Sequence, residues 1–460
     1  MKSYLERLGY YVNGKALDII DLCDKWYSNE TIEDFHKRQN LNKKEVQLSK
    51  MNFAKRCCAD DANLCEIISV APVKETASKG FIEDFLRKNR FDTMYRKQLE
   101  KTSATGTVGA YIYLQDAEYI RADGSERVRT GKIRIDYVDA DCIIPLSVND
   151  DLITECAFCG TERVAGKERT TLVIFRKENE LYLSDTVVFN EFGMILTEEC
   201  TQMQLGEVKP FAIMQNAEVN NLSDMAGYGL PKIYNAIPLF KAVDLCYSIL
   251  YGDLDKGEKL VFINELLSCI NIKDDGTYEL TPQQKELFVL TGEKMPDQKN
   301  IIQEYNPEIR SDQITKAFEL VLSLLSMSFG YGSKKYTFEN GKITTATEYI
   351  GTKQDSMQEL NKQRKQAVEY IEDIVHAAMW FSNTFNGTAY DQEEELSIEF
   401  DDSYIEDKQA KLESMRADAL SFGDVPILKV WYFMEKYNIP EEEAKKYLQY
   451  QEEPIDDVDD

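Results

Sequence analysis

Long hydrophobic runs are absent from this chain. No apolar stretch reaches about 18 residues, the length that a membrane-spanning helix requires. Lys2, Glu6 and Arg7 precede any apolar stretch, which differs from the pattern of a secretion signal. We therefore expect no membrane contact and synthesis in the cytoplasm.

Basic residues are too few to balance the acidic ones. The 460 residues include 54 Lys and Arg against 81 Asp and Glu, which gives a formal net charge of −27. Proteins that hold nucleic acid by neutralising phosphates carry basic surfaces. Free binding to nucleic acid is therefore not expected, and any role beside DNA has to tolerate repulsion.

Histidine is scarce as well. His36 and His376 are the two histidines of the chain, so a serine or cysteine triad would need one of them. His376 falls in an apolar stripe, where a histidine is more often a packed structural residue than a base. Carboxylates, in contrast, are too numerous for one pair to be chosen as acid and base. We predict no catalytic residue and no enzymatic activity.

Cysteine is present, but the spacing of the cysteines indicates no disulfide framework. In a chain without a secretion signal, the ten cysteines are expected to be reduced and buried. Cys156 and Cys159 have the spacing of a redox or zinc motif. Strand-like alternation surrounds them, however, and no second Cys or His pair follows at ligand distance. We expect neither a metal nor another cofactor.

The periodicity of the chain changes once in its first half. Residues 1–100 carry apolar positions at helical spacing, whereas residues 108–219 alternate apolar and polar positions between turn signals. The first part is expected to be helical and the second an antiparallel sheet. The predicted fold class is therefore α+β, and the 43% of hydrophobic residues suffice for a substantial core.

Two amphipathic helices are predicted on either side of a short insert. Pro238 leaves two alternatives for the first helix: it starts near Pro238, or it starts at Pro231 and bends one turn later. The expected packing residues are Ile233, Phe240 and Tyr247 of the first helix and Ile314, Phe318 and Val321 of the second.

The insert itself, residues 260–306, is predicted to be a small α+β unit. Its expected strands lie at 260–263, 270–272 and 278–280, with a turn at Asp274-Asp275-Gly276. The second amphipathic helix ends where Gly330 and Gly332 begin a loop.

The longest helical stretch follows that loop. Thr345 and Glu348 have the spacing of a capping box, in which each side chain takes one free backbone N–H. From Thr345 to about Phe385, apolar residues recur at steps of three and four, and such a helix spans roughly 60 Å. A strand at 396–400 and two or three helices, including 408–420 and 441–450, are expected to complete the chain.

This order of elements resembles that of the portal proteins of tailed bacteriophages. The local likeness is to the portal branch of long-tailed phages of Gram-positive hosts. It lies in the Thr345-Ala-Thr-Glu348 helix start, in Asn306-Pro307 with the helix after it, and in Pro210-Phe211 ahead of the first amphipathic helix. The resemblance covers nearly the whole chain, and Pro238 departs from the family's pattern.

The resemblance implies a portal-like division of the chain. The segments would be a wing of helices and antiparallel sheet (1–230), a first stem helix (231–259), a clip (260–310), a second stem helix (311–329), a tunnel loop (330–343), a long wing helix with a strand (344–402) and a helical crown (403–460).

The resemblance also implies a function. Portal proteins form rings, typically dodecamers, around a DNA channel at one capsid vertex, and they serve genome packaging, retention and ejection. The implied partners are further copies of the chain, the terminase large subunit, a head-completion adaptor, the major capsid and scaffolding proteins, and double-stranded DNA that passes non-specifically. The protein would be assembled in the host cytoplasm and reside in the virion.

Site residues follow only from the resemblance. The tunnel loop would line the channel with Lys334, Lys335, Tyr336 and Lys342, whose lysines could touch the DNA backbone transiently. Solvated loop charges explain these lysines equally well. The apolar stripes of the two stem helices would pack against neighbouring subunits, although an ordinary intramolecular core explains them too.

Two other classes of protein remain as alternatives. One is a different acidic capsid-assembly protein, such as a scaffold, which would not form a ring with an axial hole. The other is a metal-dependent nuclease, which would need carboxylates that converge on a metal ion.

Overall fold

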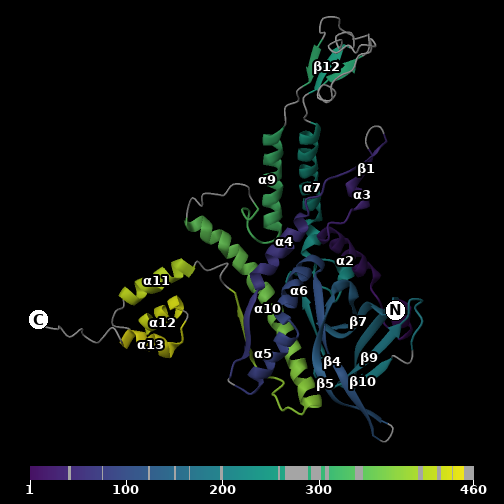
Figure 1. The fold of residues 1–460 in the computed structure, drawn as a ribbon, viewed down its shortest axis with the longest axis vertical. Helices are drawn as coiled ribbons and strands as arrows, with labels where there is room; N and C mark the ends of the chain where they lie inside the picture. The colour runs from purple at the N-terminus through teal and green to yellow at the C-terminus, as the bar shows by residue number, and fades with distance from the viewer. Residues whose placement is uncertain are drawn as a thin grey trace, which may run out of the picture.

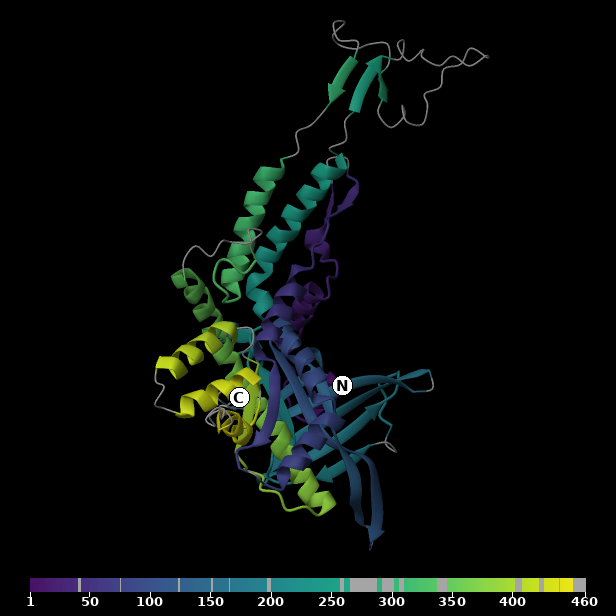
Figure 2. The same cartoon turned by 60° about the vertical axis from the view of Figure 1, so that its left-hand side comes forward.

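The computed structural model describes residues 1–39, 43–74, 76–122, 125–149, 152–164, 166–196, 200–256, 260–264, 288–291, 302–305, 310–336, 346–401, 408–421, 426–437 and 439–449. Its helices and strands form an α+β fold, as predicted. Sheets and helices make up a body, two long helices project from it, and a small sheet lies beyond their far ends (Figure 1). A second view shows the same projection (Figure 2), so the molecule is elongated.

The first hundred residues are mainly helical, as predicted. The helices are α1 (Lys2–Arg7), α2 (Gly14–Tyr27), α3 (Glu33–His36), α4 (Phe53–Ala62), α5 (Ser78–Lys88) and α6 (Phe91–Thr105). The structure adds three strands that the periodicity did not predict, β1 (Lys37–Gln39), β2 (Glu45–Gln47) and β3 (Ile67–Pro72). β1 and β2 pair with each other, whereas β3 pairs with a strand near residue 400.

The predicted sheet region forms two antiparallel sheets. One has the strand order β11-β4-β5 and the other β10-β9-β8-β7-β6. The strands are β4 (Thr107–Ala122), β5 (Ser125–Asp139), β6 (Ile143–Asn149), β7 (Leu152–Val164), β8 (Lys167–Glu178), β9 (Leu181–Phe189), β10 (Thr201–Gln204) and β11 (Phe211–Gln215).

Aromatic side chains fill the space between these two sheets. Tyr111 and Phe211 of the three-stranded sheet meet Phe158 and Phe175 of the five-stranded sheet, with ring centroids 5.2 to 5.7 Å apart. Such pairs contribute about 0.5–1.5 kcal/mol each beyond the burial of their area. The sheets are therefore held face to face by a specific aromatic core.

The projecting helices are α7 (Lys232–Lys256) and α9 (Ser311–Ser328). α7 starts directly after Pro231 and continues through Pro238, which decides between the two predicted start points. The small sheet between them consists of β12 (Leu260–Asn264), β13 (Phe288–Thr291) and β14 (Ile302–Tyr305), with β12 in the centre. The expected strands at 270–272 and 278–280 lie outside the described residues.

The long predicted helix is confirmed as α10, which spans Ala346–Asn386 and packs against β11 and β5. Its buried stripe includes Leu360, Ile371 and Val375. β15 (Leu396–Phe400) then pairs with β3, and the chain continues through α11 (Lys408–Ser421), α12 (Pro426–Tyr437) and α13 (Glu441–Gln449). These last helices pack on one another to one side of α10 (Figure 1).

Candidate functional site: the projecting helix pair and its root

The inner faces of α7 and α9 pack against each other. Ile233 and Phe240 of α7, and Ile314 and Phe318 of α9, are buried within the single chain. The other two predicted packing residues, Tyr247 and Val321, are half-buried. The intramolecular core, one of the alternatives left open above, therefore accounts for most of the predicted stripe.

A second apolar stripe lies on the opposite side of α9. Leu320, Leu324 and Met327 follow the spacing i, i+4, i+7 and are 62%, 44% and 59% exposed. They lie roughly 200° around the helix from the inner stripe, because successive residues turn by about 100°. Tyr251 and Leu254 on α7 are also exposed large apolar residues, each at 56%. The helix pair thus presents apolar surface where a solvated helix carries polar residues.

An ion pair joins the two helices at the end near the small sheet. Arg310, directly before α9, donates from Nε to Oδ2 of Asp253 at 3.0 Å and from a terminal nitrogen to Oδ1 at 2.9 Å. This bidentate geometry is the most specific form of an arginine–carboxylate contact. It fixes the spacing of α7 and α9 where the chain leaves for the small sheet and returns from it.

A buried charge cluster lies at the other end, the root of the helix pair. Lys232, the first residue of α7, is 4% exposed. Its Nζ lies 2.9 Å from Oδ1 of Asp61 on α4 and 2.8 Å from Oε1 of Glu359 on α10. Burial disfavours the charge of Lys232, but the two carboxylates outweigh it, so the pKa of Lys232 is raised. The lysine is therefore charged at neutral pH and joins three helices.

The same aspartate also holds the segment that follows α9. Tyr331 is buried, and its hydroxyl donates a hydrogen bond of 2.8 Å to Oδ1 of Asp61. Burial, followed by the charge of Asp61, raises the pKa of Tyr331 well above its usual value, so the phenol stays protonated. We call Asp61, Lys232, Tyr331 and Glu359 the root cluster.

The predicted glycine stop of α9 is confirmed. Gly330 adopts a φ of +79°, and the N–H groups of Gly330 and Tyr331 donate to the carbonyls of Met327 and Ser326. This is the Schellman arrangement, in which a left-handed glycine satisfies the last helical carbonyls. A Cβ at Gly330 would come within 3.2 Å of Cγ of Glu359, so the turn also presses against the root cluster.

The predicted loop residues fall in different environments. Lys334 is exposed, whereas Lys335 is half-buried, with its ammonium 5.4 Å from the ring centroid of Tyr331. Tyr336 is buried, with its ring edge-on to Phe53 at 5.0 Å, so it faces the core rather than solvent. The structure thus places Lys334 alone of these three on the surface.

Three further predicted residues cannot be placed in this way. Lys342 and the cap residue Thr345 lie outside the described residues, and Glu348 lies in α10 with its side chain outside them. α10 begins at Ala346, and the capping role of Thr345 and Glu348 stays a prediction.

His36 ties the N-terminal helices to α7. It is 1% exposed, and its Nδ1 accepts the N–H of Ile32 at 2.9 Å, so the proton of the neutral ring is on Nε2. Nε2 lies 3.1 Å from Oδ2 of Asp244, whose other oxygen accepts the N–H of Met51 at 2.8 Å. This is a satisfied structural pair. The second histidine, His376, places Nε2 3.0 Å from the Glu394 carbonyl oxygen, which agrees with its predicted packing role.

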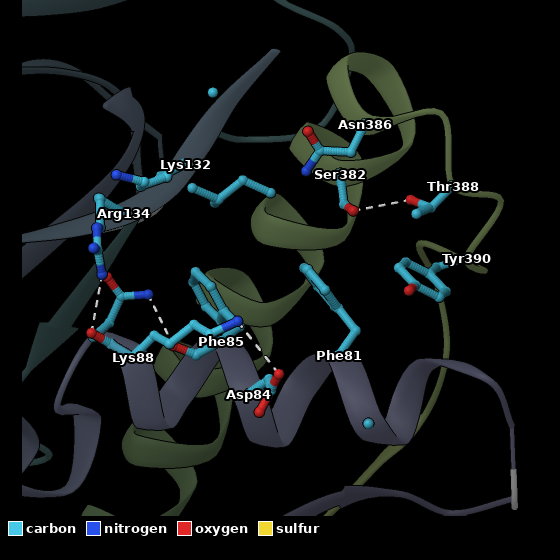
Figure 3. A pocket seen from close by; sticks show the side chains of 14 residues that line it. Phe81, Asp84, Phe85, Lys88, Lys132, Arg134, Ser382, Asn386, Thr388 and Tyr390 are labelled. Atoms are coloured by element: carbon cyan, nitrogen blue, oxygen red, sulfur yellow. Dashed lines mark hydrogen bonds and ion pairs between the residues drawn. The ribbon is translucent and has the colours of Figure 1, made fainter. Parts of the chain in front are cut away.

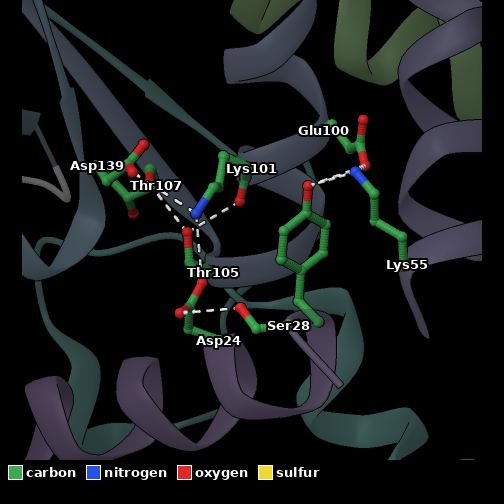
Figure 4. A network of polar contacts seen from close by, with 9 residues as sticks. Asp24, Ser28, Lys55, Glu100, Lys101, Thr105, Thr107 and Asp139 are labelled. Carbon is green, nitrogen blue, oxygen red and sulfur yellow. Dashed lines mark hydrogen bonds and ion pairs between the residues drawn. The ribbon is translucent and has the colours of Figure 1, made fainter. Parts of the chain in front are cut away.

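A polar network fastens α2, α4 and α6 together next to β5 (Figure 4). Lys101 lies 3.3 Å from Asp24 and 3.5 Å from Asp139. Burial opposes its charge, but these carboxylates outweigh that effect and raise the pKa of Lys101. Lys55 donates to the Tyr27 hydroxyl at 2.7 Å and also pairs with Glu100. The network supports the body on which the helix pair stands.

A cleft of about 770 Å³ opens between α5, β5 and the end of α10 (Figure 3). Phe81 stacks on Phe85 and Tyr390 in its apolar wall, with centroids 5.9 and 5.0 Å apart. On the rim, Lys88 pairs with Asp84 at 3.3 Å, and Arg134 donates to the Lys88 carbonyl at 3.0 Å. The charged side chains on the rim of this cleft therefore form ion pairs and hydrogen bonds with groups of the same chain.

Among the described helices, α7 is the one that could cross a membrane by length and composition. The helix Lys232–Asp255 contains an 18-residue window with a mean hydropathy of 1.2, and a third of that window is buried within the chain. No group of three or more His, Cys, Asp or Glu side chains suited to a metal occurs in the described part of the chain.

Comparison with known proteins finds similar solved structures but no family. No protein-family model matches the chain, and no curated protein matches it. Among solved structures, a chain described as "Neck of native GTA particle computed with C12 symmetry" is similar, with a TM-score of 0.40 and 10% sequence identity. The match covers 82% of this chain and 89% of that chain. At this TM-score the similarity carries no conclusion about function.

Proposed function

We propose that the protein is the subunit of a portal-type ring, a DNA conduit at one vertex of a phage capsid. Copies of the chain would stand side by side, with α7 and α9 as the stem, the small sheet as the clip and residues 330–343 near the channel. The ring would serve genome packaging, retention and ejection, and it would catalyse no reaction itself.

The outer stripe of α9 is the observation that carries this proposal. Leu320, Leu324 and Met327 are exposed although they follow helical spacing, and α7 carries exposed Tyr251 and Leu254. The exposed apolar residues of α9 and those of α7 differ from each other and lie on different helices. Contact between them therefore joins the α9 side of one copy to the α7 side of the next copy. Such heterologous contacts close into a ring when the rotation allows it.

The position of the small sheet supports the proposed docking role. It lies beyond the far ends of α7 and α9, away from the body (Figure 1). A ring of such chains would present these sheets together at one end of the channel. We assign this end to the terminase large subunit and the head-completion adaptor, and the body to contacts with capsid and scaffolding proteins.

Charge supports the conduit role. A wall that grips phosphates must break every contact again as DNA moves, whereas an acidic wall leaves the duplex mobile. The formal net charge of −27 suits such a wall. Lys334, exposed on the turn after α9, would be the described residue that touches the backbone in passing.

The test is the assembly state of the full chain with its outer stripe made acidic. Electron microscopy of the wild type should show rings with a central hole. In Leu320→Glu plus Leu324→Glu, each interface loses two leucines, each worth about 1.5–3 kcal/mol when buried. The association constant should fall more than about tenfold, while circular dichroism and thermal midpoint stay close to the wild type.

Thr315→Glu is the matched control, because Thr315 is exposed on α9 but lies outside the outer stripe. It should form rings as the wild type does. Wild-type protein that stays a single copy under all conditions would refute the proposal. An assembly without an axial hole would favour the scaffold alternative, and rings unaffected by the double substitution would show that another surface joins the subunits.

A further inference from the structure

The sheet brings together two cysteines that the sequence keeps apart. The register of β6 and β7 pairs Ile143 with Phe158, so Cys142, directly before β6, stands opposite Cys159. Cys142 ends the short 3-10 turn Ala140–Cys142, one residue beyond the paired positions. Opposite Cα atoms of antiparallel strands lie about 4.5–5.5 Å apart, and a disulfide spans about 4.4–6.8 Å, so the neighbouring strand pair brings the two cysteines into the range of a disulfide. The two thiols are close enough for each to shift the pKa of the other.

The spacing motif Cys156–Cys159, in contrast, does not form a pair. Residues three apart in a strand point to opposite faces. Cys156 is fully buried, and its Sγ donates to the Ala157 carbonyl at 3.7 Å. Cys159 therefore has its thiol partner across the strands and not along its own strand.

We propose that Cys142 and Cys159 are a redox modification site, at which a small-molecule disulfide such as glutathione disulfide oxidises them to a reversible intramolecular disulfide. Both side chains are half-buried, so a small tripeptide disulfide can reach the pair. The inference is independent of the proposed function.

The interaction with Cys142 favours Cys159 as the attacking thiolate. The hydrogen bond from Cys142 lowers the pKa of Cys159, burial and Asp141 oppose this, and the N-terminal ammonium favours it. The hydrogen bond and burial raise the pKa of Cys142. Thiolate is the reactive form in exchange. The first adduct is therefore expected on Cys159.

The exchange proceeds in two balanced steps. The Cys159 thiolate attacks one sulfur of glutathione disulfide, the S–S bond breaks, and one glutathione thiolate leaves. Cys159 is then uncharged, so Cys142 can lose its proton to water. The Cys142 thiolate attacks the Cys159 sulfur and displaces the second glutathione thiolate. The two cysteines lose two electrons and two protons, and the glutathione disulfide gains them.

The bond would cross-link an edge of the five-stranded sheet. β6 is the edge strand of that sheet and β7 its neighbour. A link at this point closes the β6–β7 hairpin and so restricts the unfolded chain. In a reducing cytoplasm glutathione keeps such a pair as thiols, and an oxidising medium drives bond formation.

The test uses the wild-type chain equilibrated with excess glutathione disulfide, then alkylated and digested without reductant. Mass spectrometry should find the linked 142–159 peptides, and the thermal midpoint should rise and return to its starting value with dithiothreitol. Cys142→Ser should stop at a stable glutathione adduct on Cys159. Cys159→Ser should form an adduct on Cys142 at least several-fold more slowly.

Cys200→Ser and Cys246→Ser are the matched controls, because these cysteines are also half-buried. Both variants should still form the 142–159 bond. Absence of that bond in the wild type overturns the proposal, whether or not the variants fold. The proposal also fails if, in Cys142→Ser or Cys159→Ser, the remaining cysteine of the pair forms a disulfide with another cysteine as readily as the wild type forms the 142–159 bond, or if Cys200 and Cys246 react as fast as Cys159.

Discussion

At the scale of single residues, the root cluster depends on Lys232. Its ammonium offsets two nearly buried carboxylates, those of Asp61 and Glu359. The more exposed Lys362 also pairs with Glu359, at 3.3 Å. Lys232→Met keeps much of the side-chain volume but leaves both carboxylates without this partner. Removing one member of a buried ion pair costs about 3–5 kcal/mol. We expect a marked fall of the thermal midpoint, measured by calorimetry or circular dichroism.

Lys15→Met is the control for that change. Lys15 pairs with Asp224 on the surface, with side chains 72% and 53% exposed. Exposed pairs contribute about 0–1 kcal/mol, so the midpoint should barely move. Equal effects of the two substitutions would mean that the root cluster adds nothing to stability.

The raised pKa of Lys232 makes a separate prediction about pH. A lysine whose pKa is higher in the folded state than in the unfolded state stabilises the fold fully below the unfolded value, about 10.4. That contribution is lost as the pH rises through the higher folded-state pKa. The stability difference between wild type and Lys232→Met should therefore be constant from about pH 7 to 10 and shrink above it. A difference that shrinks between pH 7 and 9 would contradict this assignment.

The sequence could not have predicted the root cluster. Asp61, Lys232 and Glu359 are far apart along the chain and belong to a large set of charged residues, so no spacing selects them. Tyr336 was expected on a channel surface, but its ring packs against Phe53. Which side chains are buried in a loop depends on the elements that surround it, and local patterns do not contain that information.

At the scale of elements, Pro238 is a defect within α7 that can be repaired. It is exposed, and its nitrogen cannot donate to the carbonyl one turn earlier. Alanine restores that donor, and its helix propensity in a helix interior is about 3 kcal/mol more favourable than that of proline. The greater flexibility of the unfolded alanine variant offsets about 0.4–1 kcal/mol of this gain in stability. We expect Pro238→Ala to raise the thermal midpoint of the chain.

Ring formation by Pro238→Ala tests whether assembly requires a bend of α7 at this proline. If the helix must bend for stems to meet, this variant should be more stable as a single chain but form fewer rings. Asn235→Ala, at an exposed position one turn earlier on α7, is the control and should change neither property appreciably. A lower midpoint for Pro238→Ala would show that the proline contributes packing that outweighs the missing hydrogen bond.

Helices and strands could be predicted where a local sequence pattern, such as helical periodicity or a glycine stop, determines the structure. α10 and the inner stripes of α7 and α9 follow helical periodicity, and the glycine at residue 330 ends α9 as expected. β3 was not predicted, because it forms by pairing with β15, more than 300 residues later. The outer stripe of α9 was visible as exposed leucines only after the structure had assigned the inner face.

At the scale of the whole molecule, net charge should control assembly. Each chain carries −27, so bringing copies side by side costs repulsion. Salt screens it, with a Debye length of about 30 Å at 0.01 M and 8 Å at 0.15 M ionic strength. We expect the fraction of protein in rings to increase with salt over this range, as measured by light scattering after size-exclusion chromatography.

The outer-stripe variant separates screening from other effects of salt. Leu320→Glu plus Leu324→Glu should remain largely unassembled across the same range, because screening removes repulsion but supplies no apolar contact. Rings that dissociate as salt is added would instead indicate that ion pairs between subunits drive assembly.

The shared contacts of Asp61 have a mechanical consequence. Lys232 at the start of α7 and Tyr331 just after α9 both reach the same oxygen of this side chain, at 2.9 and 2.8 Å. At the far end, Arg310 and Asp253 brace the two rods against each other. Tension or torque applied to the small sheet would travel down both rods in parallel, and the carboxylate of Asp61 in α4 is a point that both rods share. Such a load would reach the body there, as well as through Glu359 and through the pair of His36 and Asp244.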